Sequence, residues 1–375
     1  MAKLQTNGKY FDSLTGIRAV AAYMVFFHHY NPLQESNVLY GFLNEMYIGV
    51  TLFFVLSGFL ITYRYMDIDN FSFKSYMVNR IARIYPIYFI LTTITFIVQA
   101  IIYEFKFTQL LVYGLNISML RGFFDQFKFT GIAQGWTLTI EETFYLLAPL
   151  LFILLKRNKM NLLVLPLFFI SIGLGLVLVF SKFNLFGFFS SFEFMFTYTF
   201  FGRCSEFFIG IALAIFYKKS TFKKFRYFTY LGILMILLSV FLLTVVKGDF
   251  DFGVRHPLGK LINNLILPLF GIFTLFYGLL KEDTFVSRIL SSKVFVLLGK
   301  SSYVFYLIHM GIIADLLHIF LPMSDLNNCL ANFIIISIIS IIIFKYVEDP
   351  LNIFIRNYYG NRQKAYHQNS DTVKE

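Results

Sequence analysis

Two residues able to do chemistry share one helical face near the start of the chain. In DSLTGIRAVAAYMVFFHHY, Arg18 and His29 are eleven positions apart, about three helical turns and a rise of about 16 Å. Titratable side chains in an apolar segment are costly, so they are retained for a task or paired with a neighbour. A neutral imidazole can accept a proton from a hydroxyl. The alternative is a structural histidine bonded to a backbone carbonyl.

Two arginines form a second candidate site. Arg80 and Arg83, in NRIARIYPIY, are three residues apart and therefore share a helical face. Guanidinium groups bind phosphates in a bidentate manner, as a nucleotide-bearing acyl donor from the cytosol requires. The alternative is a basic pair that anchors the cytoplasmic end of a membrane helix.

Adjacent carboxylates lie inside another apolar segment, GIAQGWTLTIEETFYLLAPLL. Trp136 lies at the outer end of this segment, as is typical of an aromatic residue at the membrane interface. Glu141 and Glu142 fall at membrane depth, where a charged side chain is costly and therefore indicates a functional residue. A carboxylate there can meet His29, orient the imidazole and raise its basicity. The alternative is an ion pair with Arg18 or another buried cation.

Other polar residues in apolar segments predict packing. Ser57 and Gly58 form a small pair at mid-helix, which permits close approach of another backbone or of a ligand. Arg203 and Glu206 are three residues apart and predict a structural ion pair.

Acids and histidines near the C-terminal end are weaker candidates. His309, Asp315 and His318 fall in one segment, but they do not make a metal site by themselves. Glu348 stands two residues before Pro350, which is expected to stop the helix and leave the acid solvated.

The elements that must position these residues are membrane helices. The 375 residues are 58% hydrophobic and only 14% charged, and their mean hydropathy is +0.69, which excludes an ordinary soluble domain. The net charge of +11 comes from basic residues at the ends of apolar segments, so it indicates membrane topology and not nucleic-acid binding. Cys204 and Cys329 fall in apolar segments and predict neither a disulfide framework nor a metal site.

Apolar windows of roughly 20 residues, the length that a helix needs to cross a bilayer, occur about ten times in the chain. The sequence therefore predicts an all-α polytopic transmembrane bundle of about ten spans. With the N-terminus inside, 24 of the 32 lysines and arginines lie on the cytoplasmic side, so both termini are predicted to be cytoplasmic. The segment 109–120 is short and predicts a re-entrant or interfacial helix. Residues 1–360 are expected to form the transmembrane domain and 361–375 a disordered cytoplasmic tail. The spans are expected at 14–31, 47–63, 81–103, 132–155, 160–180, 196–217, 227–246, 261–280, 294–319 and 329–346.

Six segments in this order resemble acyltransferase family 3, the integral membrane O-acyltransferases that modify bacterial surface carbohydrates. The resemblance covers nearly the whole chain. Thr51 departs from the family pattern, in which an acidic residue is common at this position. The segments are the Arg18-to-His29 spacing, GVTLFFVLSGFLIT at 49–62, RIARIYP at 80–86, WTLTIEETFY at 136–145, GKSSYVFYLIH at 299–309 and VEDP at 347–350.

The resemblance implies transfer of an acyl group, usually acetyl from acetyl-CoA, to a hydroxyl of a surface or lipid-linked carbohydrate such as lipopolysaccharide. It places the protein in the bacterial inner membrane, with acyl-CoA as co-substrate, no metal and no nucleic-acid partner. His29 becomes the general base or a transient acyl acceptor. The catalytic set is His29, Arg18 and Glu141; the donor-binding set is Arg80, Arg83, Ser57 and Gly58; the lining set is Trp136, Tyr145, Tyr303 and His309.

A transporter or flippase of a glycan or small metabolite is the alternative, because a ten-helix bundle with buried charges also suits that task. Thioester turnover distinguishes the two functions, since a transporter consumes no acetyl-CoA.

Overall fold

A computed structural model describes residues 11–35, 37–102, 107–219, 227–322 and 325–372. Within these ranges the chain is helical and has no β-strand, as predicted. Most elements are α-helices, but η5 (Ile262–Ile272) and η6 (Phe344–Glu348) are π-helical. The α-helices are α1 Asp12–His29, α2 Val38–Asn44, α3 Gly49–Tyr65, α4 Phe73–Ile102, α5 Thr108–Ile117, α6 Trp136–Arg157, α7 Asn161–Phe180, α8 Phe192–Tyr198, α9 Phe200–Lys219, α10 Phe228–Val246, α11 Pro257–Leu261, α12 Phe273–Lys281, α13 Phe285–Leu290, α14 Lys293–Ile308, α15 Ile312–Phe320, α16 Leu326–Ile343 and α17 Asp349–Thr372. Short 3-10 turns are η1 Glu45–Ile48, η2 Arg121–Phe123, η3 Ala133–Gly135 and η4 Gly253–Arg255.

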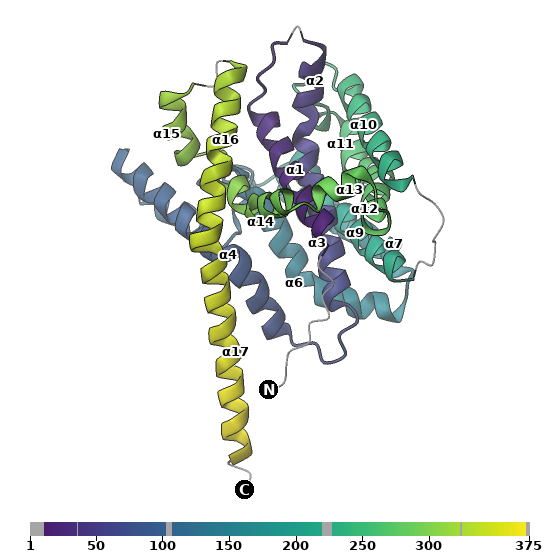
Figure 1. Ribbon diagram of the computed structural model, residues 1–375, viewed down its shortest axis with the longest axis vertical. Coiled ribbons are helices and arrows are strands. Elements are labelled where there is room, and N and C mark those ends of the chain that lie inside the picture. Colours follow the sequence, from purple (N-terminus) through teal and green to yellow (C-terminus); the bar gives the residue numbers. More distant parts are fainter. Residues whose placement is uncertain (1–10, 36, 103–106, 220–226, 323–324, 373–375) are drawn as a thin grey trace.

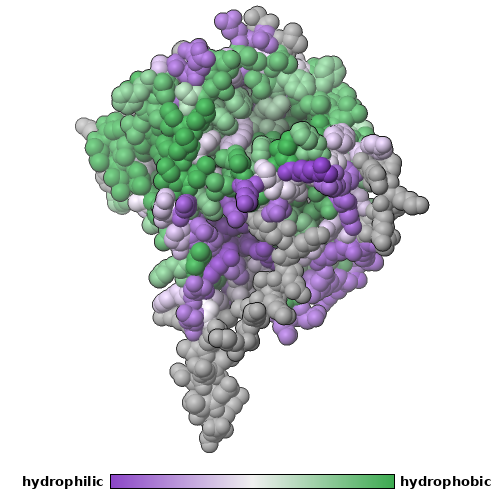
Figure 2. Space-filling model, in the orientation of Figure 1, coloured by the Kyte–Doolittle hydropathy of each residue, from purple (hydrophilic) through white to green (hydrophobic). Residues whose placement is uncertain are grey.

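Eight helical stretches of the described chain are long and apolar enough to cross a membrane. A ninth is formed if α14 and α15, which meet at an 83° bend, make one broken span. Figure 2 shows apolar side chains gathered in one part of the visible face and hydrophilic side chains beyond it, as expected for a protein seated in a bilayer.

Each of the ten predicted spans contains helix among its described residues, but the count of ten is not confirmed, because α1 is not among the membrane-length candidates. This helix has eighteen residues, and Asp12, Arg18, His28 and His29 lower its hydropathy. The predicted segment 109–120 overlaps the ten-residue helix α5, which begins at Thr108, is about 15 Å long and is too short to cross a bilayer.

The long C-terminal rod formed by α16, η6 and α17 stands at one side of the bundle, and α17 extends past the other helices (Figure 1). Helix α17 continues to Thr372. The disordered tail at 361–375 stays a prediction.

Two close helix pairs form the centre of the bundle: α1 packs on α14 and α3 packs on α9. Glycines allow the second contact. A Cβ on Gly58 would lie 2.2 Å from the carbonyl oxygen of Phe207, and one on Gly210 would lie 2.1 Å from that of Val55. Gly58 therefore contacts the backbone of α9, so the observed role of this position is helix packing.

Replacing Gly58 by alanine is expected to lower the midpoint of thermal unfolding in detergent, because the new methyl group meets backbone that cannot rotate away. Overpacking of this kind costs about 1–3 kcal/mol. Gly175→Ala on α7 is the matched control: nothing lies within 4 Å of its Cβ position, so better helix propensity should leave the midpoint equal or higher. Equal midpoints for Gly58→Ala and the unmodified protein would contradict this packing.

Candidate functional site

His29 and His309 are in contact where α1 and α14 end side by side. His29 is the last residue of α1, and His309 directly follows α14. His29 Nδ1 lies 3.3 Å from His309 Nε2, and the two ring centroids are 5.3 Å apart. His309 is fully buried, whereas His29 is exposed. His29 is therefore the member of the pair that a ligand can reach.

Backbone carbonyls determine the tautomers of the two neutral rings, because a carbonyl oxygen only accepts hydrogen bonds. His309 Nδ1 lies 2.8 Å from the Tyr306 carbonyl oxygen and so carries the proton, which leaves Nε2 as an acceptor. His29 Nδ1 lies 2.9 Å from the Val25 carbonyl oxygen, so it also carries its proton and directs it to both Val25 and His309. The lone pair of His29 is therefore on Nε2, which bonds no described residue. The carbonyl-bonded and the proton-accepting readings of His29 are compatible, since they use different nitrogens.

The neighbouring histidine, His28, points elsewhere. Its Nδ1 lies 2.5 Å from the Asn44 carbonyl oxygen, and its ring packs against Phe252 with centroids 5.1 Å apart. The adjacent histidines thus have different partners, as their separation around the helix predicts.

Replacing His309 by phenylalanine is expected to slow about tenfold any reaction in which His29 accepts a proton, without unfolding the protein. The ring volume is kept, but the acceptor for His29 Nδ1–H is lost, and one hydrogen bond of about 1.4 kcal/mol corresponds to a factor of ten. His309→Gln offers a carbonyl acceptor and should recover part of the rate. Initial rates and thermal unfolding of the purified variants test this, and a His309→Phe variant with the original rate would show that His309 does not position His29.

Glu141 lies in a hydrogen-bonded triad with Ser57 and Tyr145. Ser57 Oγ donates to Glu141 Oε1 at 2.7 Å, the Tyr145 hydroxyl donates to Oε2 at 3.4 Å, and the two hydroxyls are 3.3 Å apart. The triad connects α6 to α3. The predicted contact between Glu141 and His29 is therefore wrong, because the carboxylate faces α3 while the imidazole is held by α14.

Three predicted arginines gather near this triad without closing an ion pair to any described residue. Arg18 Nε donates to Ser302 Oγ at 3.5 Å. Arg80 is 7% exposed, and its guanidinium lies 5.9 Å from the ring centroid of Tyr145. Arg83 lies within electrostatic range of Arg18 and Arg80, and the triad carboxylate lies within range of Arg18 and Arg83. The structure thus brings the predicted arginines together, and most of their N–H groups have no hydrogen-bond partner in the described part of the chain.

Glu348 belongs to the same cluster, so the prediction of a solvated acid is wrong. Its exposure is 6%, and it lies within electrostatic range of Arg18 and Arg83. The helix does not stop before Pro350. The π-helical turn η6 leads directly into α17, where Pro350 is the second residue. Proline has no backbone N–H, so it removes one hydrogen bond of the helix without ending it.

Tyr303 and Trp136, two of the predicted lining residues, are held by different parts of the bundle. The Tyr303 hydroxyl donates to the Ile84 carbonyl oxygen at 2.9 Å, next to Arg83 in the chain. Trp136 is 5% exposed, and its ring lies between Tyr47 and Tyr198, with centroids 6.3 and 4.9 Å away. Trp136 is therefore not part of a lipid-facing aromatic belt, because η1 and α8 cover the start of α6.

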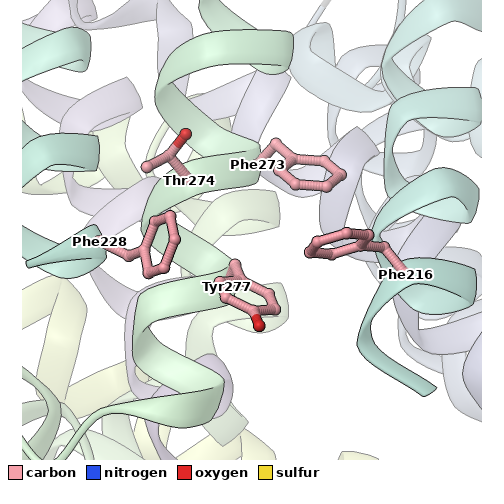
Figure 3. A pocket seen from close by; sticks show the side chains of 5 residues that line it. All are labelled: Phe216, Phe228, Phe273, Thr274 and Tyr277. Atoms are coloured by element: carbon pink, nitrogen blue, oxygen red, sulfur yellow. The ribbon is translucent and has the colours of Figure 1, made fainter. Parts of the chain in front are cut away.

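A cavity of about 200 Å³ lies apart from all these residues, where α9, α10 and α12 meet (Figure 3). Its polar groups are two hydroxyls, and it has no charged lining. It therefore offers no group suited to acyl transfer. The lining residues are Phe216, Phe228, Phe273, Thr274 and Tyr277.

Comparison with known proteins identifies the family. The model of a family described as an acyltransferase domain matches residues 11–346, which is most of the chain. The chain belongs to acyltransferase family 3. This match includes both histidines and the three arginines, and it ends two residues before Glu348.

Relatives of this acyltransferase family member include proteins of Staphylococcus aureus. One from strain COL, named "Putative O-acetyltransferase", is 26% identical over 336 residues, 82% of this chain and 51% of the relative. Another, from strain NCTC 8325 and named O-acetyltransferase OatA, is 34% identical over 187 residues, 46% of this chain and 30% of the relative. The chain spans about half the length of the first of these relatives. No solved structure matches the chain.

The family member also contains the ion pair predicted from spacing. Arg203 and Glu206 are fully buried and joined by two hydrogen bonds of 2.7 Å. Arg203 further donates to the Tyr47 hydroxyl at 3.0 Å and to Thr51 Oγ1 at 3.1 Å. Thr51 thus accepts a hydrogen bond from the guanidinium whose charge Glu206 neutralises.

Proposed function

We propose that the protein is a membrane O-acetyltransferase that moves an acetyl group from cytosolic acetyl-CoA to a hydroxyl of a surface or lipid-linked carbohydrate. Membership of acyltransferase family 3 and the names of the O-acetyltransferase relatives support this proposal. The bacterial inner membrane is the proposed location. The observation that carries the mechanism is the free Nε2 of exposed His29, held in one tautomer by Val25 and His309.

His29 Nε2 takes the proton of the acceptor hydroxyl as its oxygen attacks the thioester carbonyl. The new C–O bond forms, the C–S bond breaks, and the leaving thiolate of CoA receives the proton from the imidazolium. His309 and the Val25 carbonyl hold Nδ1–H throughout, so the ring stays aligned. An acyl-histidine route would use the same Nε2 lone pair as the nucleophile.

The arginine cluster is the proposed site for the donor. Arg80 and Arg83 bind phosphate groups of acyl-CoA, and Arg18 lies between them and the histidine end of α1. On the predicted topology this cluster is on the cytoplasmic side, where acyl-CoA is made available. The triad of Glu141, Ser57 and Tyr145 lines the path between the cluster and the acceptor.

Mass analysis of surface glycans tests the proposal directly. Cells that carry the protein should show glycans heavier by single acetyl groups, sensitive to mild alkali as O-esters are, and cells without it should lack them. Identical glycan masses in the two strains, with the protein present in the membrane, would contradict a role in carbohydrate O-acetylation.

A further inference from the structure

Helix α17 adds a polar face to the arginine cluster from beyond the family match, which ends at residue 346. It packs on α4. Asn352 and Arg356 follow Glu348 at intervals of four residues and so lie on the same helical face. Arg356 Nη2 donates to the Asn79 carbonyl oxygen at 3.4 Å, which places this face against α4 beside Arg80.

Four polar atoms at this junction are buried and have no hydrogen-bond partner among the described residues. Buried polar groups are nearly always paired in folded proteins, so several unpaired atoms at one place indicate a bound ligand or water. Both donors and acceptors are present. The four atoms are Arg80 Nε, Glu348 Oε2, Asn352 Oδ1 and Arg356 Nε.

The charged groups at the junction face one another without closing ion pairs in the described structure. Arg356 lies within electrostatic range of Arg80 and Arg64, and Asp349 is the acid that faces it. Glu142 lies within range of Arg80, and Glu348 within range of Arg83. The cations therefore outnumber the acids, and their donors remain available to an anion.

We propose that Arg356 and Asn352 bind the phosphorylated adenosine end of the acyl-CoA donor, next to Arg80. The inference rests on the proposed function, because it extends the donor site of that reaction. A guanidinium can hold phosphate oxygens through two N–H groups, and an amide oxygen can accept a hydrogen bond from a nucleoside amino or hydroxyl group. Arg83 remains for the other phosphate groups of the donor, and Arg18, which lies within range of Glu141, remains for the thioester end.

Kinetics with two donors test this site in the purified full-length protein. For Arg356→Ala, the KM for acetyl-CoA should rise about tenfold to a hundredfold with little change in kcat, as expected for a lost charge-assisted contact. Turnover of S-acetyl-pantetheine, which has no nucleotide, should not change. Arg356→Lys should keep part of the affinity, and Arg288→Ala, which removes an exposed ion pair with Asp283, is the matched control. An unchanged KM, or equal losses with both donors, would overturn the assignment.

Direct binding separates failure of this inference from failure of the proposed function. If the unmodified protein consumed no acetyl-CoA, the proposed function would fail, but binding of 3′-phosphoadenosine 5′-phosphate could still be measured. Weaker binding by Arg356→Ala in vesicles of phosphatidylcholine supports the site, and equal binding overturns it. A difference between the two proteins that appears only in vesicles of phosphatidylglycerol would assign Arg356 to a lipid headgroup and also overturn the proposal.

Discussion

His29→Ala should reduce O-acetylation of the acceptor by about 10²- to 10⁴-fold, the range that a positioned general base contributes. The substitution removes the only exposed imidazole of the histidine pair and the free Nε2 with it. His309 cannot replace it, because His309 is fully buried and its Nδ1 is bonded to the Tyr306 carbonyl. The O-acetyl content of glycans from cells that carry only the variant measures the effect.

The control for this loss is the adjacent histidine. His28→Asn keeps a side-chain N–H that can donate to the Asn44 carbonyl, so it should preserve both membrane level and activity. Equal losses for His28→Asn and His29→Ala would indicate a general effect on folding. Normal O-acetylation by the His29→Ala variant would remove His29 from the mechanism.

The second large effect concerns stability. Arg203→Met is expected to destabilise the protein by about 3–5 kcal/mol, the usual result of removing one partner from a buried ion pair. Glu206 would remain as an unpaired buried carboxylate, and Tyr47 and Thr51 would each lose a guanidinium donor. Thermal unfolding in detergent and the amount of folded protein in membranes measure this change.

A double variant distinguishes the unpaired charge from the lost packing. Arg203→Met combined with Glu206→Leu removes both charges and should recover much of the stability, because apolar replacement of a whole buried pair is often neutral. Arg288→Ala, at an exposed pair, should leave the unfolding midpoint unchanged. If Arg203→Met unfolded at the original midpoint, the pair would not hold α9 to α3 and η1.

The helices could be predicted from the sequence because apolar segment length and charge placement are local properties. Each of the ten predicted spans coincides with helix, and α5 is the short helix that its length indicates. The Arg203–Glu206 pair was also predictable, since three residues of separation place both on one helical face. The bend between α14 and α15 was not predicted, because segment length and mean hydropathy treat 294–319 as one span, whereas the chain breaks near Gly311, whose φ is +91°.

Several residues of the candidate site were predicted from the sequence, but the contacts between residues of different helices were not. Arg80 and Arg83 share a face by spacing, but their approach to Arg18 depends on where the bundle places α1 and α4. The His29–His309 contact joins residues 280 positions apart, and no local pattern reports such a pairing. Glu348 was misplaced because a proline usually ends a helix, whereas the π-helical turn η6 carries the chain through it.

The position of Trp136 could not be predicted from the sequence either, because this residue was expected at the membrane interface but is buried. An aromatic residue at the end of an apolar segment is typical of the membrane interface, but Tyr47 and Tyr198 from distant segments cover it. Local chemistry therefore predicts which residues are expensive to bury, and tertiary packing decides which partners they meet.

Release of CoA thiol by the purified protein in lipid vesicles is the most direct test of acyl transfer through His29. We expect steady release of CoA thiol from acetyl-CoA by the unmodified protein and by His28→Asn. For a His29→Ala variant of equal thermal stability, we expect the rate of release to fall at least a hundredfold, which is within the range that general-base catalysis contributes. Release by His29→Ala at the rate of the unmodified protein, or no release by any of the three proteins, would contradict acyl transfer through His29.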